Sequence, residues 1–590
     1  MNSRRQQLCG LLMAFAGLLG PSTTAFAAAT LYVATDGNDA WTGKLAAPNA
    51  ERSDGPLATL AKARDAVRAL KAAGPLVEPV SVQIRGGVYS ITETLAFGPG
   101  DSGAPGAAIS YEAYPGETPE LVGGRRIEGL RPAKGPILSV HLPAVEAGKW
   151  YFRQLFVNGR RQVRARYPNV DANDPIRRGF LYVASRRGGF GVTVNNIHNH
   201  DDWTEYRVQI PADGEYVFWI YYGAHNAPFG TTDMSGRTTL SVDGGEPVPL
   251  VDLVDTGAWP ASRWARAANL RLKQGERVLR WRNVRGGGLT LDAFALCDDP
   301  QWKPSGTDPA EPAAGKHLLV FQAEHFIASH GPQLSVSSGG GSKTEFHYGP
   351  GEVKPSWAAE PDAELHIFQS GSCRAFKEIL AIEAIDPHAR KVAVGGPEAV
   401  AALNAGDRYF VENLFEELDA PGEWHLNRKT GVLSLIPPDG FSEAGEVVAP
   451  AVGCIIEVAG ASHLRFAGLL VRNSDYTPAD GCGGYGMGDY GTLAFSGARH
   501  CAVEGCTFTD TGRYAVCIRE GGDNVVRGSD ISNSGQGGVL ILRSPRNQVV
   551  DNHIHDCGAI YKHIGGVVLE GEGTDENRVA ATGKPAGKKG

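Results

Sequence analysis

Residues 509–558 read TDTGRYAVCIREGGDNVVRGSDISNSGQGGVLILRSPRNQVVDNHIHDCG and repeat every 23 residues. Glycine recurs at this step, each time two residues after an acidic or amide side chain and four after an apolar one. The three sets are Gly512, Gly535 and Gly558; Asp510, Asn533 and Asp556; and Phe508, Ile531 and Ile554. Short strand-like runs with a fixed step of about 20–25 residues and no helical pattern between them are typical of a parallel β-solenoid.

Such a solenoid stacks equivalent residues of successive coils about 4.8 Å apart, which is the spacing of parallel strands. We therefore expect Phe508, Ile531 and Ile554 to form an interior stack. Asn524 and Asn547 keep the same step and predict an amide ladder in a turn. The long segment TPADGCGGYGMGDYG, residues 477–491, interrupts the coils and predicts a loop on the binding face.

Composition narrows the class of protein. The chain has 590 residues, 42% of them hydrophobic and 21% charged, which is ordinary for a globular protein with more than one domain. Its net charge of -8 and the absence of a long basic run argue against a nucleic-acid partner. The 77 glycines suit a fold of many short strands and tight turns.

The first 27 residues have the pattern of a secretory signal peptide. Arg4 and Arg5 precede an apolar stretch from Leu8 to Leu19, and the small-residue pattern ends at Ala27. About a dozen apolar residues are too few to span a membrane, so we expect cleavage near Ala27 and a secreted or periplasmic protein without a membrane span. The remaining cysteines show no CxxC pair, so we expect buried thiols or local disulfides rather than a metal site.

An amphipathic helix is predicted after residue 59. Leu60, Ala63, Val67 and Leu70 share one face, Thr59 is placed to cap the helix, and Gly74 ends it. The open end of a solenoid exposes apolar residues and requires such a cap. Residues 28–185 are therefore predicted to form the N-terminal cap and the first coils.

Two further motifs carry a resemblance to a known family. The stretches LFVNGRRQVRARYPN (155–169) and RYFVENLFEELDAPGEWHLNRKTGVLSLIPP (408–438) resemble those of glycoside hydrolases related to family 141. These are secreted proteins with the right-handed parallel β-helix of the pectate-lyase-like class. The resemblance implies an all-β fold and hydrolysis of a complex plant or algal polysaccharide.

Residues 186–362 are predicted to interrupt the β-helix with a jelly-roll-like β-sandwich, because strands alternate there between turn residues. This segment resembles carbohydrate-binding modules of families 6 and 35, and the resemblance implies sugar stacking on aromatic faces. The candidate side chains are Trp203, Trp259 and Trp264, which the alternative interpretation places in the sandwich core.

No cofactor is expected apart from Ca²⁺. Asp292 and Glu324 are the candidate ligands, although isolated carboxylates do not supply the six to eight oxygens that Ca²⁺ takes. Residues 363–590 are predicted to form the later coils. Because the last ten residues contain neither an apolar strand nor a capping helix, we expect the β-helix to be truncated there.

The carboxylates at equivalent positions of the coils are the candidate catalytic groups. Asp510 and Asp556 lie two coils apart, which places their backbones roughly 9–10 Å from each other. Glycoside hydrolysis uses two carboxyl groups, and a separation of about 6.5–9.5 Å favours inversion. Glu520 and Glu570 are further catalytic candidates. The alternative is that an Asp or Asn two residues before Gly only forms the turn that ends each coil.

Other polar residues are candidates for holding the substrate, a polysaccharide or oligosaccharide bound by a monomer. They are His555, Asn533, Arg519 and Asp489. Arg160, Arg161, Arg164 and Arg166 could line a groove for an anionic substrate, but strand alternation sends them to different faces, which favours solvated charges.

Two other functions stay open. A polysaccharide lyase of the same fold would need a basic residue near a uronate carboxylate, and Arg519, Arg543 and Lys562 are available. The third alternative is a non-catalytic carbohydrate-binding surface protein.

Overall fold

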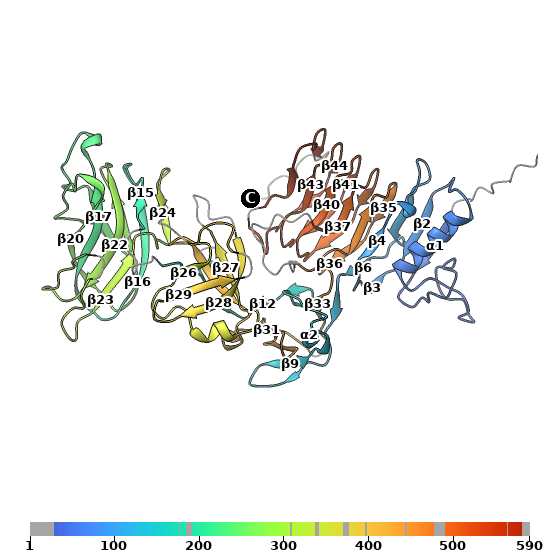
Figure 1. Ribbon diagram of the computed structural model, residues 1–590, viewed down its shortest axis with the longest axis horizontal. Coiled ribbons are helices and arrows are strands. Elements are labelled where there is room, and N and C mark those ends of the chain that lie inside the picture. The colour runs from blue at the N-terminus through green and yellow to red at the C-terminus, as the bar shows by residue number, and fades with distance from the viewer. Residues whose placement is uncertain are drawn as a thin grey trace, which may run out of the picture.

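A computed structural model describes residues 29–580 apart from 176–177, 185–191, 307–308, 337–341, 370–376, 396–397, 443–444, 477–489 and 563. The fold is all-β, and its largest part is a parallel β-helix with three faces (Figure 1). Within the described residues, no helix is both long and apolar enough to cross a membrane.

Each face of the β-helix is one parallel sheet. The first contains β1 (Ala29–Val33), β2 (Val80–Ile84), β5 (Ile109–Ala113), β35 (Leu464–Ala467), β38 (Ala502–Glu504), β41 (Val525–Arg527), β44 (Gln548–Val550) and β47 (Arg578–Ala580). The second contains β3 (Gly87–Ser90), β6 (Pro119–Val122), β36 (Leu470–Arg472), β39 (Thr507–Thr509), β42 (Asp530–Ser532) and β45 (His553–Ile554). The third contains β4 (Leu95–Phe97), β34 (Ile456–Ala459), β37 (Gly491–Ser496), β40 (Tyr514–Arg519), β43 (Val539–Leu542) and β46 (Val567–Glu570).

The 23-residue repeat sets the register of the later coils, as predicted. Phe508 is the parallel partner of Ile531, and Ile531 is the partner of Ile554. Phe508 and Ile531 are fully buried in the main core, against which Ile554 packs. The repeat therefore specifies which residues fill the interior of each coil.

The predicted amide ladder is also confirmed. Asn547 Oδ1 accepts hydrogen bonds from the backbone N–H of Asn524 at 3.0 Å and from Asn524 Nδ2 at 3.1 Å. Asn577 Oδ1 accepts the corresponding two bonds from Asn547 at 2.7 and 3.0 Å. Because Asn524 and Asn547 are fully buried, the ladder satisfies turn N–H groups that have no contact with water.

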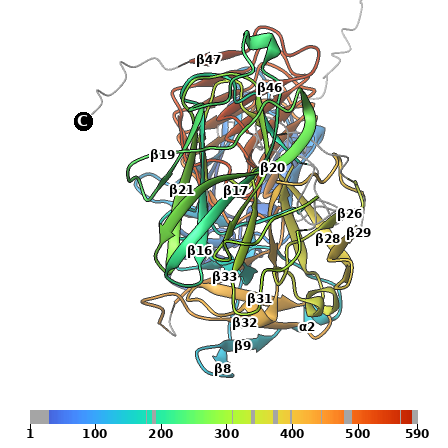
Figure 2. The same cartoon turned by 90° about the vertical axis from the view of Figure 1, so that its left-hand side faces the viewer.

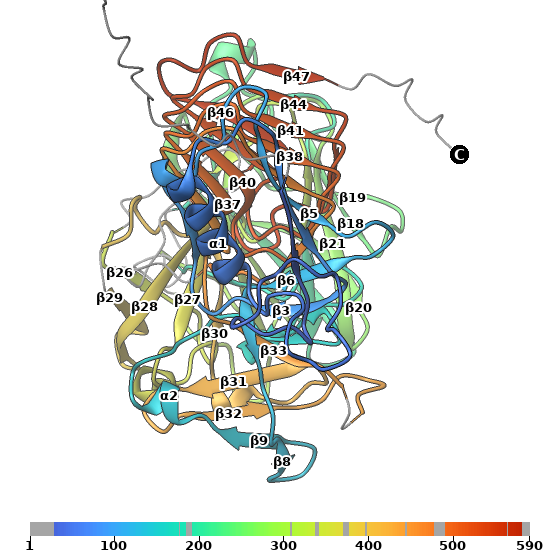
Figure 3. The same cartoon turned by 90° about the vertical axis from the view of Figure 1, so that its right-hand side faces the viewer.

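The N-terminal cap follows the prediction. Helix α1 (Leu60–Ala73) begins after Thr59, whose hydroxyl accepts a hydrogen bond from the backbone N–H of Lys62. Leu60, Ala63 and Val67 are buried against the first coils. Figure 3 shows α1 lying across the end of the β-helix.

The interruption of the β-helix is larger than the predicted 186–362. β5 pairs directly with β35, and β4 pairs with β34, so the coils stop near residue 122 and resume near 455. The predicted boundaries at 185 and 363 were therefore wrong. Strand alternation cannot show which sheet a strand joins, and the extra antiparallel strands were assigned to coils.

The antiparallel strands next to the β-helix form three small sheets. The first contains β7 (Gly124–Arg126), β10 (Phe156–Val157), β11 (Arg160–Arg161) and β33 (Val447–Pro450). The second contains β8 (Arg131–Pro132), β9 (Leu138–His141), β12 (Val163–Arg164), β31 (Glu423–Asn427) and β32 (Val432–Leu435), and it lies near α2 (Pro143–Glu146). The third, called here the seven-stranded sheet, contains β13 (Arg166–Tyr167), β14 (Leu181–Tyr182), β26 (Glu345–His347), β27 (Glu364–Phe368), β28 (Lys377–Asp386), β29 (Lys391–Gly395) and β30 (Arg408–Glu412).

The predicted β-sandwich is present, within residues 194–336. One of its sheets contains β15 (Val194–Asn195), β17 (Gly214–Ala224), β20 (Ala258–Leu272), β22 (Leu289–Cys297), β23 (Leu318–Gln322) and β25 (Ser335–Val336). The other contains β16 (Trp203–Ile210), β18 (Thr238–Val242), β19 (Val248–Pro249), β21 (Gly275–Asn283) and β24 (Ala328–His330). Figure 1 shows the sandwich at the opposite end of the molecule from α1, with the seven-stranded sheet between it and the β-helix, and in Figure 2 the sandwich faces the viewer.

The described cysteines are thiols. Cys297, Cys501, Cys506 and Cys517 are buried, and Cys454 and Cys557 are half-buried. Cys373 and Cys482 lie outside the described residues, as do the predicted signal peptide and the long loop at 477–489. The expectation of buried thiols holds for the cysteines that the structure describes.

The amide ladder generates a stability prediction. In Asn547→Ala, two N–H donors of Asn524 lose their acceptor, at about 1–3 kcal/mol for each buried unsatisfied group. We expect the free energy of unfolding to fall by about 2–4 kcal/mol, measured by urea denaturation followed by circular dichroism. Gln548→Ala changes the adjacent exposed side chain and serves as the control, with an expected change below about 0.5 kcal/mol. Equal effects of the two substitutions would contradict the ladder's role.

Candidate active site

A cavity of about 230 Å³ lies where the seven-stranded sheet approaches the turns of the β-helix. Its walls come from three parts of the chain: residues 153–180, the seven-stranded sheet, and β-helix segments near residues 476 and 559–562. The polar side chains that line it are Arg153, Gln154, Arg161, Gln162, Arg164, Arg166, His366, Lys377, Glu412, Tyr476 and Lys562. The polar lining of the cavity is therefore mainly basic, with few carboxylates.

A buried ion cluster stands at one wall of this cavity. Arg153 Nε donates to Glu364 Oε1 at 2.5 Å, and Arg164 Nη1 lies 2.7 Å from Glu364 Oε2. Burial alone would raise the pKa of Glu364, but the charges of Arg153 and Arg164 outweigh it and hold that pKa well below its usual value. Glu364 is therefore ionised at neutral pH and fixes both guanidinium groups.

A second carboxylate, Glu412, stands beside the first. Glu364 and Glu412 are direct cross-strand partners on β27 and β30, and His366 follows Glu364 by two residues on the same face. His366 Nε2 lies 3.2 Å from Glu412 Oε2 and 3.5 Å from Glu364 Oε2. Burial lowers the pKa of His366, against the opposing charge of Glu412, so its imidazole is neutral at pH 7.

Two lysines reach the same cavity. Burial lowers the pKa of Lys377 to about 7, with Glu412 opposing the shift. Burial also lowers the pKa of Lys562, whose Nζ donates to the carbonyl oxygen of Gly558 at 2.7 Å. A lysine with a pKa near 7 exchanges protons readily at physiological pH.

Asp510 lies beside the lining residue Arg161 but does not itself line the cavity. Its side chain is only 8% exposed, and burial raises its pKa while the charge of Arg161 opposes the shift. Arg161 lines the cavity and donates to the carbonyl oxygens of Thr511 and Asn533 at 3.1 and 3.3 Å. A carboxyl group with a raised pKa suits the donation of a proton.

Aromatic rings complete the lining. Phe180, Phe368, Phe410 and Tyr476 face the cavity, and the guanidinium of Arg166 lies 3.5 Å from the centroid of Phe410. The His366 ring stacks on Phe410 with centroids 4.8 Å apart. An apolar surface beside polar groups fits a small polar ligand such as a sugar.

The repeated acidic residues occupy strained turns. Asp510, Asn533 and Asp556 have φ values of 51°, 50° and 49°, which lie in the left-handed region that Asn and Asp tolerate best. Their shared position in the coils is as predicted. Asp556, with a side chain 73% exposed, is hydrogen-bonded to His555 and does not line the cavity.

The other predicted site residues lie elsewhere. Glu520 is exposed and pairs with Arg543 at 3.0 Å, Glu570 ends β46, and Arg519 Nε donates to Ser496 Oγ at 2.9 Å. None of these lines the cavity, and Asp489 falls outside the described residues. Their catalytic and binding roles stay predictions.

The arginine-rich motif was expected to carry solvated charges, but most of its arginines are buried or line the cavity. Arg164 and Arg166 are 3% and 7% exposed, and with Arg161 they line the cavity, whereas Arg160 is exposed. The motif is not one strand: it divides among β11, β12 and β13, which belong to three different sheets. Simple alternation along a strand therefore did not apply.

The three candidate tryptophans of the sandwich are half-buried, and each packs on neighbours. Arg280 lies over the Trp203 ring at 4.3 Å, Trp259 contacts His198, and Trp264 packs on Tyr221 with centroids 5.1 Å apart. Trp259 and Trp264 lie on β20, while Trp203 lies on β16 of the opposite sheet. An odd spacing of five residues along β20 does not put Trp259 and Trp264 on one face, and sugar binding at any of the three rings stays a prediction.

The predicted Ca²⁺ ligands are buried in the sandwich. Asp292 is 4% exposed and Glu324 is 1% exposed. Neither belongs to the two groups of described side chains that bring three potential metal ligands together. Ca²⁺ binding there stays a prediction.

The sequence did not single out Glu364, His366, Lys377 or Glu412. Their only local signal is that acidic, basic and imidazole groups stand among apolar residues in these short stretches. Lys562 and the arginines were named, but the partners that bring them together lie up to several hundred residues away in the chain. Pairing of β27 with β30 creates the cluster, and strand pairing is not readable from a single sequence.

Comparison with known proteins bears out the fold. Residues 456–579 match the family model described as a right handed beta helix region, which confirms the predicted fold class and its handedness. No curated protein matches the chain.

Several solved structures resemble the chain at low similarity. One described as a glycoside hydrolase is 14% identical with a TM-score of 0.39, over 94% of this chain and 96% of that one. XylC in complex with xylose is 9% identical with a TM-score of 0.34, over 92% of this chain and 56% of that one. A family 35 carbohydrate binding module from Clostridium thermocellum is 24% identical with a TM-score of 0.15, over 24% of this chain and 96% of that one. Membership of family 141 and a carbohydrate-binding role for the sandwich remain proposals.

The buried ion cluster predicts a pH-dependent loss of stability. The lowered pKa of Glu364 means that its stabilising effect is present above the unfolded value of about 4.3 and is lost as the pH falls below it. We expect Glu364→Gln to lower the free energy of unfolding by about 3–5 kcal/mol at pH 7, and by less below pH 4.

Glu423→Gln is the matched control with the opposite sign. Burial raises the pKa of Glu423 to about 7, so ionisation above that pH destabilises the folded state. We expect this substitution to leave stability unchanged or to increase it at pH 8. Urea denaturation at several pH values measures both, and equal losses for the two variants would refute the assignment.

Lys377 gives a second prediction about this cavity. Because only a neutral amine attacks acetic anhydride, acetylation of Lys377 should reach half its maximal rate near pH 7. Peptide mapping by mass spectrometry measures the modification, with a lysine in an unstructured peptide as the reference, titrating near pH 10.4. Identical profiles for the two lysines would contradict the shifted pKa.

Proposed function

We propose that the protein is a secreted glycoside hydrolase that acts on a complex plant or algal polysaccharide, and that the reaction occurs in the cavity described above. The observation that carries this proposal is the convergence of Glu412, His366, Lys377 and several arginines on one aromatic-lined cavity. Such a concave surface, with few polar groups of shifted pKa among apolar ones, has the character of an enzyme site. The resemblance of residues 155–169 and 408–438 to family 141 relatives supports the substrate class.

Glycoside hydrolysis needs one group to protonate the leaving oxygen and a second carboxyl group to activate water or attack the sugar. Asp510 suits the first role because its pKa is raised. Glu412 suits the second because it lines the cavity and is held by His366. Glu364 is bound by two arginines, which suits positioning rather than proton transfer.

The sandwich and the sequence of the N-terminus complete the proposal. The sandwich would hold polysaccharide near the catalytic part, with Trp203, Trp259 or Trp264 as the stacking residue. The signal-like first 27 residues support secretion or export to the periplasm. The protein would work as a monomer.

A polysaccharide lyase is the second candidate, and one observation favours it. β-Elimination from a uronate needs a base to remove the proton beside the carboxylate, and cationic groups to neutralise that carboxylate. Lys377, with a pKa of about 7, suits the base, and Arg161, Arg164 and Arg166 suit the neutralisation. A non-catalytic carbohydrate-binding protein is the third candidate.

Product analysis with a panel of plant and algal glycans distinguishes these functions. New reducing ends without ultraviolet absorbance indicate hydrolysis, and unsaturated products that absorb in the ultraviolet indicate elimination. Binding without either product supports the third candidate.

Substitution of the two carboxyl groups tests the site. We expect Glu412→Gln and Asp510→Asn each to lower kcat by about 10²–10⁴-fold, which is the usual effect of removing an acid or base. Circular dichroism should show intact folding. Asp523→Asn is the control because Asp523 occupies a similar left-handed turn and pairs with Arg546 away from the cavity.

Unchanged turnover in both Glu412→Gln and Asp510→Asn would remove these residues from the mechanism. The same assay on Asp556→Asn, Glu520→Gln and Glu570→Gln tests the remaining candidates from the sequence. A loss in those variants alone would move the reaction to the outer faces of the coils.

A further inference from the structure

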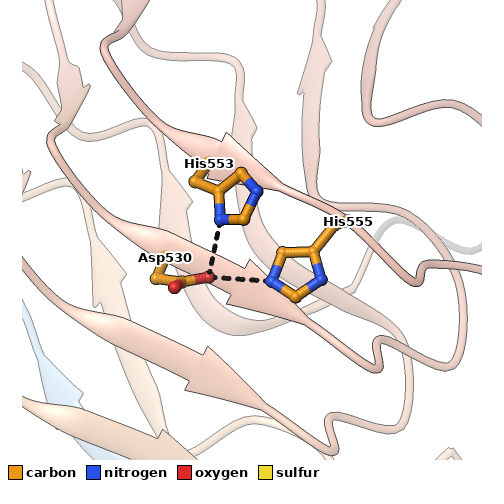
Figure 4. A group of neighbouring side chains, drawn as sticks. All are labelled: Asp530, His553 and His555. Carbon is orange, nitrogen blue, oxygen red and sulfur yellow. Dashed lines mark hydrogen bonds and ion pairs between the residues drawn. The ribbon is translucent and has the colours of Figure 1, made fainter. Parts of the chain in front are cut away.

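Two histidines and an aspartate meet on the outer face of the last coils. Asp530 on β42 is the direct parallel partner of His553 on β45. His555 follows His553 by two residues and therefore points to the same face, while Ile554 between them faces the core. Figure 4 shows both imidazoles directed at the Asp530 carboxylate.

We propose that Asp530, His553 and His555 bind a divalent transition-metal ion of the zinc class. His nitrogen and carboxylate oxygen are ligands that Zn²⁺ takes, with bonds of about 2.0–2.2 Å. In a tetrahedral site, bonds of this length separate neighbouring ligand atoms by about 3.3–3.6 Å. Asp530 Oδ1 lies 3.2 Å from His555 Nε2 and 3.7 Å from His553 Nδ1, close to that separation.

The third pair of ligand atoms, one nitrogen from each histidine, also lies close together. One ligand atom from each residue lies within 4.8 Å of the other two. The two imidazoles are stacked, with centroids 4.3 Å apart, which keeps both rings beside the same carboxylate. The face is exposed, and water can complete the coordination.

Asp556 supplies an outer partner typical of zinc sites. Its Oδ2 lies 2.7 Å from His555 Nδ1, which directs the opposite nitrogen, Nε2, at Asp530. A carboxylate in this position fixes the imidazole tautomer and increases its basicity as a ligand. It also adds a second negative charge beside the cation.

Two other arrangements in the described chain are weaker candidates. Glu364, His366 and Glu412 also come together, but Arg153 and Arg164 already neutralise Glu364 and would repel a cation. His463 and His500 stack across two coils with centroids 5.0 Å apart, but they do not form part of a three-ligand group. Among the described residues that bring three potential ligands together, the group of Asp530, His553 and His555 is therefore the stronger candidate.

The metal would join successive coils. Asp530 belongs to one coil and both histidines to the next, so one ion would cross-link them near the C-terminal end of the described β-helix. This inference does not depend on the proposed function, because the site lies outside the cavity.

Isothermal titration of the full, tag-free and metal-free protein with ZnCl₂ tests the proposal. We expect about one equivalent to bind with a micromolar Kd and to raise Tm, because a ligand that binds only the folded state stabilises it. His553→Ala and Asp530→Asn should each weaken binding at least 10-fold. His500→Ala, which changes the other stacked pair, should leave the Kd unchanged.

Cobalt substitution provides a second measurement that a general loss of folding cannot imitate. Co²⁺ bound at this site should give visible absorption bands of a low-coordinate complex, which are lost in Asp530→Asn while circular dichroism is retained. Millimolar Ca²⁺ should not displace it, because Ca²⁺ takes six to eight oxygens. Failure to bind Zn²⁺ at 100 μM, or a Kd equally affected by His553→Ala and His500→Ala, would overturn the proposal.

Discussion

The parallel stacking of identical coil positions is the constraint on which the structure depends. Each coil has too few apolar residues to form a core alone, so its interior side chains must lie directly over those of the coils on either side. The pairing of Phe508 with Ile531 and Ile554 meets that requirement. The buried asparagine ladder meets the second requirement, because turn N–H groups inside the stack have no water to bind.

The same constraint explains how a very long interruption is tolerated. β5 and β35 are neighbours in one sheet although Ala113 and Leu464 lie far apart in sequence. The register on both sides of the interruption is fixed by the stack, so the chain between can leave and return without disturbing a coil. The free-energy cost of closing a loop grows only slowly with its length. The sandwich and the small antiparallel sheets therefore add to the β-helix without weakening it.

The sequence predicted those features whose residues lie close together along the chain and missed those that depend on distant residues. The coil register, the amide ladder and the capped helix α1 all come from spacings within a few tens of residues, and each was correct. The boundaries of the interruption were wrong because a short buried strand such as β27 does not reveal from its own sequence whether it joins a coil or an antiparallel sheet. The cluster at Glu364 and Glu412 depends on pairing between distant strands, and no spacing reveals it. Asp510 was found by its repeat position, although burial raises its pKa and the opposing charge comes from Arg161, far away in sequence.

The interruption of the β-helix also supplies buried charged groups, which the coils themselves cannot accommodate. A residue in the stack is limited by its neighbours above and below, and polar positions such as Asn533 and Asp556 serve left-handed turns. The seven-stranded sheet is free of that limit and can bury charges of opposite sign side by side. Its Glu364 is held ionised by arginines, while Lys377 on the neighbouring strand β28 is driven toward the neutral form by burial. When one cavity shifts the pKa values of its groups in different directions, one group can donate a proton, another can accept one, and a third can stabilise charge. Such a set of groups requires residues from both the β-helix and the interruption.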